Sequence, residues 1–157
     1  MSDNPVDPIL GRVPSGVYIL TARHGDQETG MLASWVVQAG FDPPAVTLAI
    51  KQGRYLNDWI DAGAPIVLNV LGQSQTSMLG HFGKGFEPGE SAFDSLDIER
   101  TDQGVAVLPG VVGFLECEVT GHVDSGDHRI YLANVVGGKM TGDEKPMVHV
   151  RKSGLHY

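Results

Sequence analysis

The sequence lacks the features that mark secreted, membrane-spanning and nucleic-acid-binding proteins. Its only cysteine is Cys117, so no internal disulfide can form, which is typical of a protein from a reducing compartment. There is no charged-then-apolar leader and no apolar run long enough to span a bilayer. The formal net charge of −8 disfavours nucleic acid and anionic membranes as partners, because both favour basic surfaces. We therefore expect a cytoplasmic protein with no nucleic-acid and no membrane partner.

The common catalytic and metal-binding signatures are also missing from the sequence. No Gly-x-Gly-x-x-Gly follows a predicted strand, and Gly83-Lys84 is not followed by the Ser or Thr of a phosphate-binding P-loop. His122 and His128 flank a turn, but no carboxylate–His array completes a site, so we predict no metal. Cys117 lies in an apolar run, where an inert buried thiol is expected. Either a bound cofactor carries the chemistry, or the chain is not an enzyme.

Length and composition predict a single domain over residues 1–157. A chain of this size buries about two-thirds of its unfolded surface, which is enough for a full core and a ligand cavity. The apolar fraction of 41% is ordinary for a globular protein. Residues 1–9 are polar and contain prolines, so we expect a flexible lead-in there.

Short strands dominate the predicted secondary structure, and a few short helices interrupt them. Strands are predicted over residues 17–22, 31–39, 45–50, 65–71, 105–108, 111–123, 128–136 and 147–150. Helical segments are predicted over residues 9–12 and 55–62, and a further helix is expected to begin with Ser74 as its N-cap. Gly137-Gly138 is expected to end its strand. The later strands run in hairpin order, which favours an antiparallel sheet or barrel.

Residues 30–50 are the most informative stretch, because they hold two apolar runs joined by a Pro-Pro pair. Neither proline can donate to a sheet ladder, so the first strand must end before Pro43. Unpaired backbone N–H groups are then expected near Gln38–Phe41, where they suit an anionic or heterocyclic ligand. Ser34 and Gln38 place polar groups in the first run, where they either bond a neighbouring strand or face a ligand.

This stretch resembles the flavin reductase-like, FMN-binding split-barrel family. That family includes flavoredoxins, the reductase components of two-component flavin monooxygenases and the C-terminal reductase domain of some flavodiiron proteins. The similarity rests on residues 30–44 and continues, in order, at Gly11–Tyr18, Val67–Leu71, Gly80–Lys84 and Gly126–Tyr131. The resemblance implies a mainly β fold, an antiparallel FMN-binding split β-barrel of Greek-key type with two or three short helices. It also implies a homodimer with the flavin near the subunit interface.

The function implied by the resemblance is NAD(P)H-dependent reduction of FMN. The reduced flavin would pass its electrons to free flavin, to oxygen or to a redox protein partner. FAD is a possible cofactor in place of FMN. Two alternatives stay open: a non-enzymatic FMN-binding electron-relay module like flavoredoxin, and a split barrel that binds another planar cofactor, such as haem or pyridoxal phosphate.

The resemblance also assigns cofactor-binding roles within the central stretch. The residues that match the strand along the isoalloxazine are Ala33, Ser34, Trp35 and Val36. Those that match the start of the ribityl–phosphate contacts are Gln38, Ala39 and Gly40. Related reductases often carry Ser or Thr at the last two positions, so backbone donors are expected to act there instead. Trp35 either stacks on the cofactor or is a core aromatic.

Charged and aromatic residues elsewhere complete the implied site. Lys51, Gly53 and Arg54 lie at the start of a predicted helix, where two cations suit a phosphate group, although solvated surface charges are the alternative. Lys84 matches a lysine that reaches the flavin, and Tyr157 matches an aromatic near the end of the domain. His128 matches a histidine near the flavin and nicotinamide, so we expect it to be the catalytic residue.

Overall fold

Seven antiparallel strands form the central sheet of the computed structural model, which describes residues 3–157. The strand order is β3-β2-β6-β9-β10-β5-β4. The bounds are β2 (Tyr18–His24), β3 (Gln27–Ala33), β4 (Val36–Phe41), β5 (Pro44–Lys51), β6 (Ile66–Val70), β9 (Gly113–Ser125) and β10 (His128–Met140). The edge strands β3 and β4 follow each other in the chain, joined only by Ser34–Trp35. This confirms the predicted split β-barrel and locates its opening at Ser34–Trp35.

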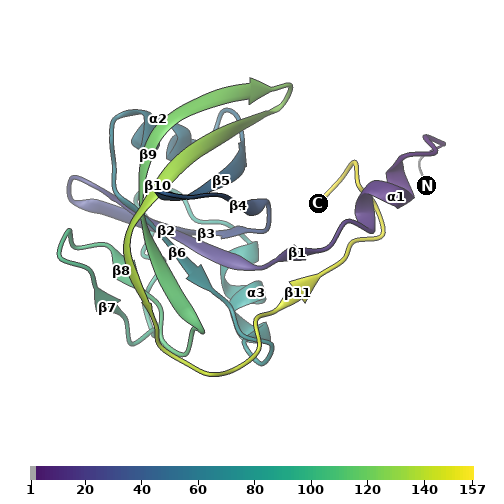
Figure 1. Ribbon diagram of the computed structural model, residues 1–157. Coiled ribbons are helices and arrows are strands. Elements are labelled where there is room, and N and C mark those ends of the chain that lie inside the picture. Colours follow the sequence, from purple (N-terminus) through teal and green to yellow (C-terminus); the bar gives the residue numbers. More distant parts are fainter. Residues whose placement is uncertain (1–2) are drawn as a thin grey trace.

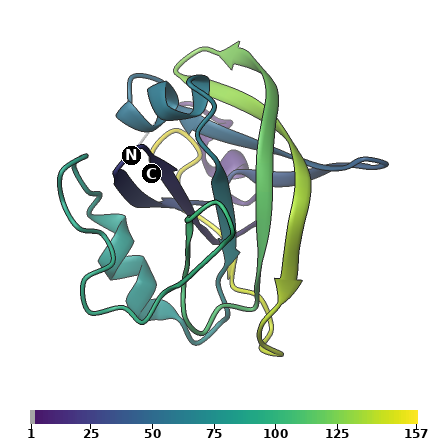
Figure 2. The same cartoon turned by 90° about the vertical axis from the view of Figure 1, so that its left-hand side faces the viewer.

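The predicted strand over residues 31–39 is therefore wrong in one respect, since it is two strands interrupted at Ser34–Trp35. Beyond the break, β4 pairs only with β5, and the tip of this hairpin projects away from the barrel (Figure 2). The strand ends at Phe41, before Pro43, as the proline pair predicts. Phe41 is 89% exposed at the tip.

The two longest strands, β9 and β10, form a hairpin whose turn is Gly126-Asp127. Gly126 has a φ of +58°, which favours glycine. The predicted end of the strand at Gly137-Gly138 is wrong, because β10 continues to Met140 with a register shift between Val135 and Gly137. Gly138 has a φ of +139°, and its backbone lies against the carbonyl oxygen of Phe114, so glycine allows the strand to bulge and go on.

Three helices accompany the sheet: α1 (Asp7–Gly11), α2 (Tyr55–Asp61) and α3 (Thr76–Gly83). Helix α2 buries the apolar side chains of Leu56, Trp59 and Ile60 and confirms the helix predicted over residues 55–62. The N-cap of α3 is Gln75 and not Ser74, because the Ser74 hydroxyl donates to Glu144 Oε2 at 2.8 Å. None of the helices among residues 3–157 is both long and apolar enough to cross a membrane.

Two apolar clusters fill the fold. One packs the barrel strands against α2 and includes Leu20, Leu48 and Tyr131; the other lies around α3 and includes Ile19 and Phe82. The short pair β7 (Glu99–Arg100) and β8 (Ala106–Val107) borders the sheet. The fully buried Asn69 side chain links these parts through hydrogen bonds to Ile19 O, Thr21 Oγ1 and the Leu108 N–H.

The two ends of the chain form an arm beside the barrel (Figure 1). In this arm β1 (Ser15–Gly16) pairs with β11 (Val148–His149), and α1 lies at its far end. Asp7 is buried in the contact between α1 and the C-terminal segment. Of the predicted flexible lead-in, residues 1 and 2 lie outside the described residues, whereas the last part, from Asp7, belongs to α1.

Candidate functional site

A cavity of about 580 Å³ lies where the barrel is split. Strands β3 and β5, helix α3 and the arm all contribute to its wall. The lining residues are Val17, Met31, Leu32, Ala33, Ser34, Trp35, Ala49, Ile50, Lys51, Arg54, Leu79, Phe82, Gly83, Lys84, Gly85, His149, Arg151 and Tyr157. Most of this wall is apolar, as expected of a site for a planar organic ligand.

The charge of this cavity is opposite to that of the whole chain. Four cationic side chains line it, Lys51, Arg54, Lys84 and Arg151, and no Asp or Glu does. None of these four cations makes an ion pair with a carboxylate of residues 3–157. The net charge of the protein is −8, so unpaired positive charge gathered in one cavity points to an anionic ligand.

The turn between β5 and α2 positions two of these cations. Lys51 ends β5, Gly53 turns the chain with a φ of +84°, and Arg54 is the extended N-cap of α2. The backbone N–H of Arg54 donates to Asn57 Oδ1 at 3.1 Å, so the turn is fixed through the main chain. The Arg54 side chain, whose Nη1 lies 3.8 Å from Met31 Sδ, remains available to a ligand.

A second cavity, of about 420 Å³, adjoins the first. The residues common to both walls are Trp35, Ala49, Lys51, Arg151 and Tyr157. The Trp35 carbonyl accepts a hydrogen bond from the Ala49 N–H at 3.0 Å, which fixes the chain where it crosses the split. The guanidinium of Arg151 lies 5.2 Å from the centre of the Trp35 ring, within the range of a cation–π contact.

His128 belongs to the second cavity and is only 8% exposed. Its Nδ1 lies 2.8 Å from Asp127 Oδ1, and its Nε2 bonds the hydroxyl of Tyr157. The bond from His128 lowers the pKa of Asp127, so that carboxylate stays ionised and accepts from Nδ1–H. In the neutral imidazole, Nε2 is then the acceptor and the Tyr157 hydroxyl is the donor.

The arm holds the C-terminal residues over these cavities. Asp7 Oδ1 accepts hydrogen bonds from the Ser153 hydroxyl and from the Gly154 and Leu155 N–H groups, at 2.6, 2.7 and 3.1 Å. These bonds, first of all the one from Ser153, lower the pKa of Asp7. Because Tyr157 follows this tied segment, α1 helps to place a residue of the site.

The structure brings together most of the predicted site residues, but not all. Seven of them line the first cavity: Ala33, Ser34, Trp35, Lys51, Arg54, Lys84 and Tyr157. His128 lines the second cavity with three of these, and Gly53 lines a separate small pocket beside α2. Val36, Gln38, Ala39 and Gly40 line none of these cavities. They lie on β4, which leaves the barrel opening after the break at Ser34–Trp35 and carries them onto the projecting hairpin.

The sequence reasoning missed two polar residues of the first cavity, His149 and Arg151. They arrive there because β11 pairs with β1 and because the Arg151 N–H donates to Gly11 O at 2.8 Å. No local signal in the sequence marks this pairing between distant segments. Among residues 3–157, no group of three or more His, Cys, Asp or Glu side chains could hold a metal ion.

Comparison with curated proteins finds long flavoproteins that contain a region like this chain. Putative diflavin flavoprotein A 5 of Nostoc sp. (strain PCC 7120) is 37% identical over 155 residues, which are 98% of this chain and 27% of that protein. Diflavin flavoprotein A 1 of Synechocystis sp. (strain PCC 6803) is 35% identical over 157 residues, again 27% of its length. The chain therefore spans about a quarter of the length of these relatives.

Solved structures share the fold over nearly the whole chain. The NADH:FAD oxidoreductase SgcE6 of Streptomyces globisporus C-1027 superposes with a TM-score of 0.83 at 26% identity, covering 94% of this chain and 86% of that one. The styrene monooxygenase flavin reductase of Pseudomonas putida S12 has a TM-score of 0.77 at 22% identity, covering 91% and 90%. The sequence profile of the flavin reductase like domain matches residues 10–154. The chain therefore belongs to the flavin reductase like domain family.

Proposed function

We propose that this protein is a flavin-binding oxidoreductase that uses NAD(P)H to reduce FMN. The observation that carries the proposal is the first cavity, in which four unpaired cations and no carboxylate face an apolar wall. An isoalloxazine ring suits the apolar part, and an ionised phosphate suits the cations. FAD meets the same requirements and is the alternative flavin.

Lys51 and Arg54 are the proposed phosphate-binding residues. Both residues lie in one turn, and each can donate charge-assisted hydrogen bonds to a phosphate monoester. Ala33, Ser34 and Trp35 lie across the opening of the barrel and are proposed to face the ring. When bound, the flavin supplies the hydride-accepting centre, and the protein needs to provide binding and orientation.

The second cavity is the proposed site of the nicotinamide nucleotide, with His128 as its hydrogen-bonding residue. Lys51 and Arg151 are shared by the two cavities, so phosphorylated ligands in both can meet the same positive charge. Both nitrogens of the His128 ring have partners within the protein. The Tyr157 hydroxyl must therefore release Nε2 before His128 can bond a ligand through that atom.

The similarity to an NADH:FAD oxidoreductase supports a nicotinamide nucleotide as donor. The length of the curated relatives supports an electron acceptor that lies in another part of a longer protein, with free flavin or oxygen as the alternatives.

We also propose a homodimer. Exposed apolar side chains on α1 and on the β4–β5 hairpin, among them Ile9 and Phe41, are suited to a subunit interface.

The test is a spectroscopic titration of the purified protein with FMN, followed by anaerobic addition of NADH and of NADPH. We expect binding in a 1:1 ratio per chain and bleaching of the flavin absorbance by at least one nucleotide. A protein that ignores FMN would overturn the proposal. Binding without bleaching by either nucleotide would leave an electron-relay module, reduced by another protein. A Soret band would indicate haem instead.

A further inference from the structure

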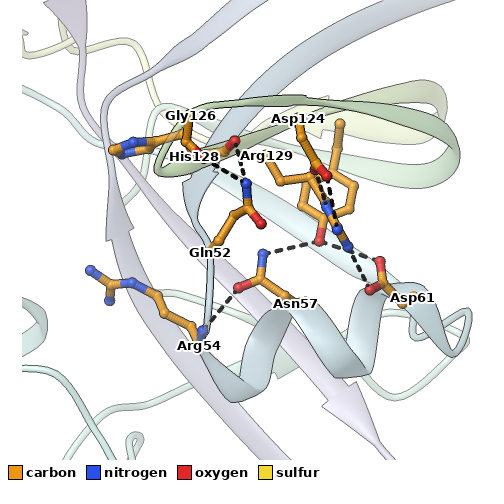
Figure 3. A network of polar contacts seen from close by, with 9 residues as sticks. Gln52, Arg54, Asn57, Asp61, Asp124, Gly126, His128 and Arg129 are labelled. Atoms are coloured by element: carbon orange, nitrogen blue, oxygen red, sulfur yellow. Dashed lines mark hydrogen bonds and ion pairs between the residues drawn. The ribbon is translucent and has the colours of Figure 1, made fainter.

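Gln52 makes three hydrogen bonds to the turn of the β9–β10 hairpin (Figure 3). Its side-chain Nε2 donates to Gly126 O at 2.9 Å and to His128 O at 3.2 Å. Its backbone N–H donates to Asp127 O at 2.9 Å. One residue thus satisfies three consecutive carbonyl groups around His128, from a position in the chain between Lys51 and Arg54.

Other contacts also hold this hairpin: His128 pairs with Lys51 of β5 and with Ser125 of β9, and its ring nitrogens bond Asp127 and Tyr157. The β5–β10 ladder ends with the pair Lys51–His128, so Gln52 supplies the next contacts beyond the last ladder position. The turn closes a hairpin of two 13-residue strands, and beyond the Lys51–His128 pair Gln52 bonds this turn to the end of β5. Both hydrogens of the Gln52 amide are used, which leaves the turn one preferred position relative to β5.

Gln52 acts without touching either cavity. It lines neither the first nor the second, but a small pocket of about 190 Å³ on the other side of the turn, next to α2. It is half-buried, and its side-chain amide faces the hairpin in Figure 3. A ligand in either proposed subsite would therefore not contact Gln52, whose hydrogen bonds reach the turn beside His128 instead.

A second set of hydrogen bonds fixes the turn between β5 and α2, which carries Lys51 and Arg54. Asn57 accepts from the Arg54 N–H and donates to the Tyr131 hydroxyl at 3.0 Å, as part of the network in Figure 3. Arg129, next to His128, bonds Asp61 at 2.8 Å and Asp124 at 2.7 Å. The turn that carries Lys51 and Arg54 is thus anchored by α2 and β5. Arg129 also ties β10 to α2, but beyond the Lys51–His128 pair Gln52 bonds the Gly126-Asp127 turn to the end of β5. Loss of the Gln52 amide should displace His128 and leave the cations in place.

We infer that Gln52 is a positioning residue that fixes His128 relative to Lys51 and Arg54. The inference extends the proposed function, since a flavin phosphate on the cationic turn and a nucleotide beside His128 would then be held at a set separation. It predicts that the position of the His128 ring in the native protein is set by the hydrogen bonds of Gln52 to the Gly126-Asp127 turn. It also predicts that Gln52 matters for turnover more than for flavin affinity.

The test compares Gln52→Met with Gln103→Met, which changes an exposed glutamine in a distant turn. Methionine keeps the length of the side chain but has no amide donor. Proton NMR of the His128 ring reports its position, because the ring lies 4.7 Å from the Trp35 ring and senses its ring current. We expect the His128 ring-proton shifts and their NOEs to Trp35 to change in Gln52→Met and to stay unchanged in Gln103→Met.

The kinetic arm measures FMN reduction by NADH or NADPH. For Gln52→Met we expect kcat to fall at least about tenfold and the FMN Kd to change less than about threefold, a split that general unfolding would not give. Unchanged His128 shifts together with an unchanged kcat would overturn the inference. If the wild-type protein reduces no flavin, the proposed function fails, but the NMR comparison still decides the position of His128. Should Gln52→Met fold poorly, Gln52→Lys, which retains donors at similar reach, is expected to restore the native shifts.

Discussion

The imidazole of His128 lies against the indole of Trp35, with ring centroids 4.7 Å apart and planes tilted by 42°. The ring of Tyr157 lies 5.7 Å from the same indole, and the guanidinium of Arg151 lies 5.2 Å from it. Trp35 lines both cavities and is not buried in the core, and its stacking on a cofactor stays a prediction. Its half-buried side chain lies between the two cavities and contacts residues from two distant parts of the chain, β10 and the C-terminal segment.

Replacing Lys51 and Arg54 together by Ala should weaken FMN binding selectively. Each charge-assisted bond to an ionised group contributes about 1.5–3 kcal/mol, so the double variant should lose a few kcal/mol of binding free energy. The hydrogen bond to Asn57 Oδ1 comes from the main-chain N–H of Arg54 and is kept in the variant, so α2 should stay capped. Fluorescence titration with FMN and with riboflavin measures the difference.

Riboflavin has no phosphate, so its affinity should barely change in that variant. Lys152→Ala is the matched control, because Lys152 is an exposed cation that lines none of the three cavities. Equal losses for FMN and riboflavin would show that Lys51 and Arg54 do not bind the phosphate.

Replacing Arg151 by Ala should weaken the binding of phosphorylated ligands, although sequence reasoning gave this residue no role. Its guanidinium lines both cavities, and among residues 3–157 it has one hydrogen-bond acceptor, His156 O at 3.2 Å, which leaves other N–H groups for a ligand. We expect a loss of about 1.5–3 kcal/mol for a ligand whose phosphate it bonds. Arg151→Lys should recover only part of it, because Lys keeps the charge but not the planar contact with Trp35. Unchanged FMN and nucleotide affinities in isothermal titration would contradict this.

Replacing Asp7 by Ala should loosen the C-terminal segment. The carboxylate accepts from Ser153, Gly154 and Leu155, and its lowered pKa means that the ionised form is the one the fold prefers. The contact is complete above the ordinary pKa of 3.8 and should be lost as the pH falls further below it. Trypsin cleavage at Lys152, measured at neutral pH, should be faster in Asp7→Ala. Asp3→Ala is the control, and equal cleavage rates in the two variants would refute the role of Asp7.

Cys117 should be unreactive in the folded protein and should make stability fall at high pH. Burial raises the pKa of its thiol from an ordinary 9.0 to about 12. Between these values the unfolded state loses the thiol proton and the folded state keeps it, so unfolding becomes more favourable as the pH rises, by at most about 1.4 kcal/mol per pH unit. Denaturant unfolding of the wild type and of Cys117→Ala, compared from pH 8 to 11, isolates this contribution from that of the tyrosines. Rapid thiol labelling without denaturant would argue against burial.

The strands and helices could be predicted because their signals are local. The stripe of Leu56, Trp59 and Ile60 specifies α2, and the apolar runs specify the barrel strands. The cationic turn could be located for the same reason, since Lys51 and Arg54 lie together in the chain. The break at Ser34–Trp35 could not, because an apolar run of strand-forming residues continues through it. The resemblance assigned Gln38, Ala39 and Gly40 to the ribityl–phosphate contacts, and beyond this break they line none of the three cavities.

The sequence by itself determined a mainly β domain of one family, its strand and helix segments, and a pair of cations at one turn. Only the tertiary structure decided that His149 and Arg151 join the site, that Asp7 holds the C-terminal segment, and that Gln52 bonds the turn beside His128. The physical reason is the same in each case. These contacts join residues far apart in the chain, and their geometry is fixed by strand register and by packing of the chain ends, which no local pattern encodes.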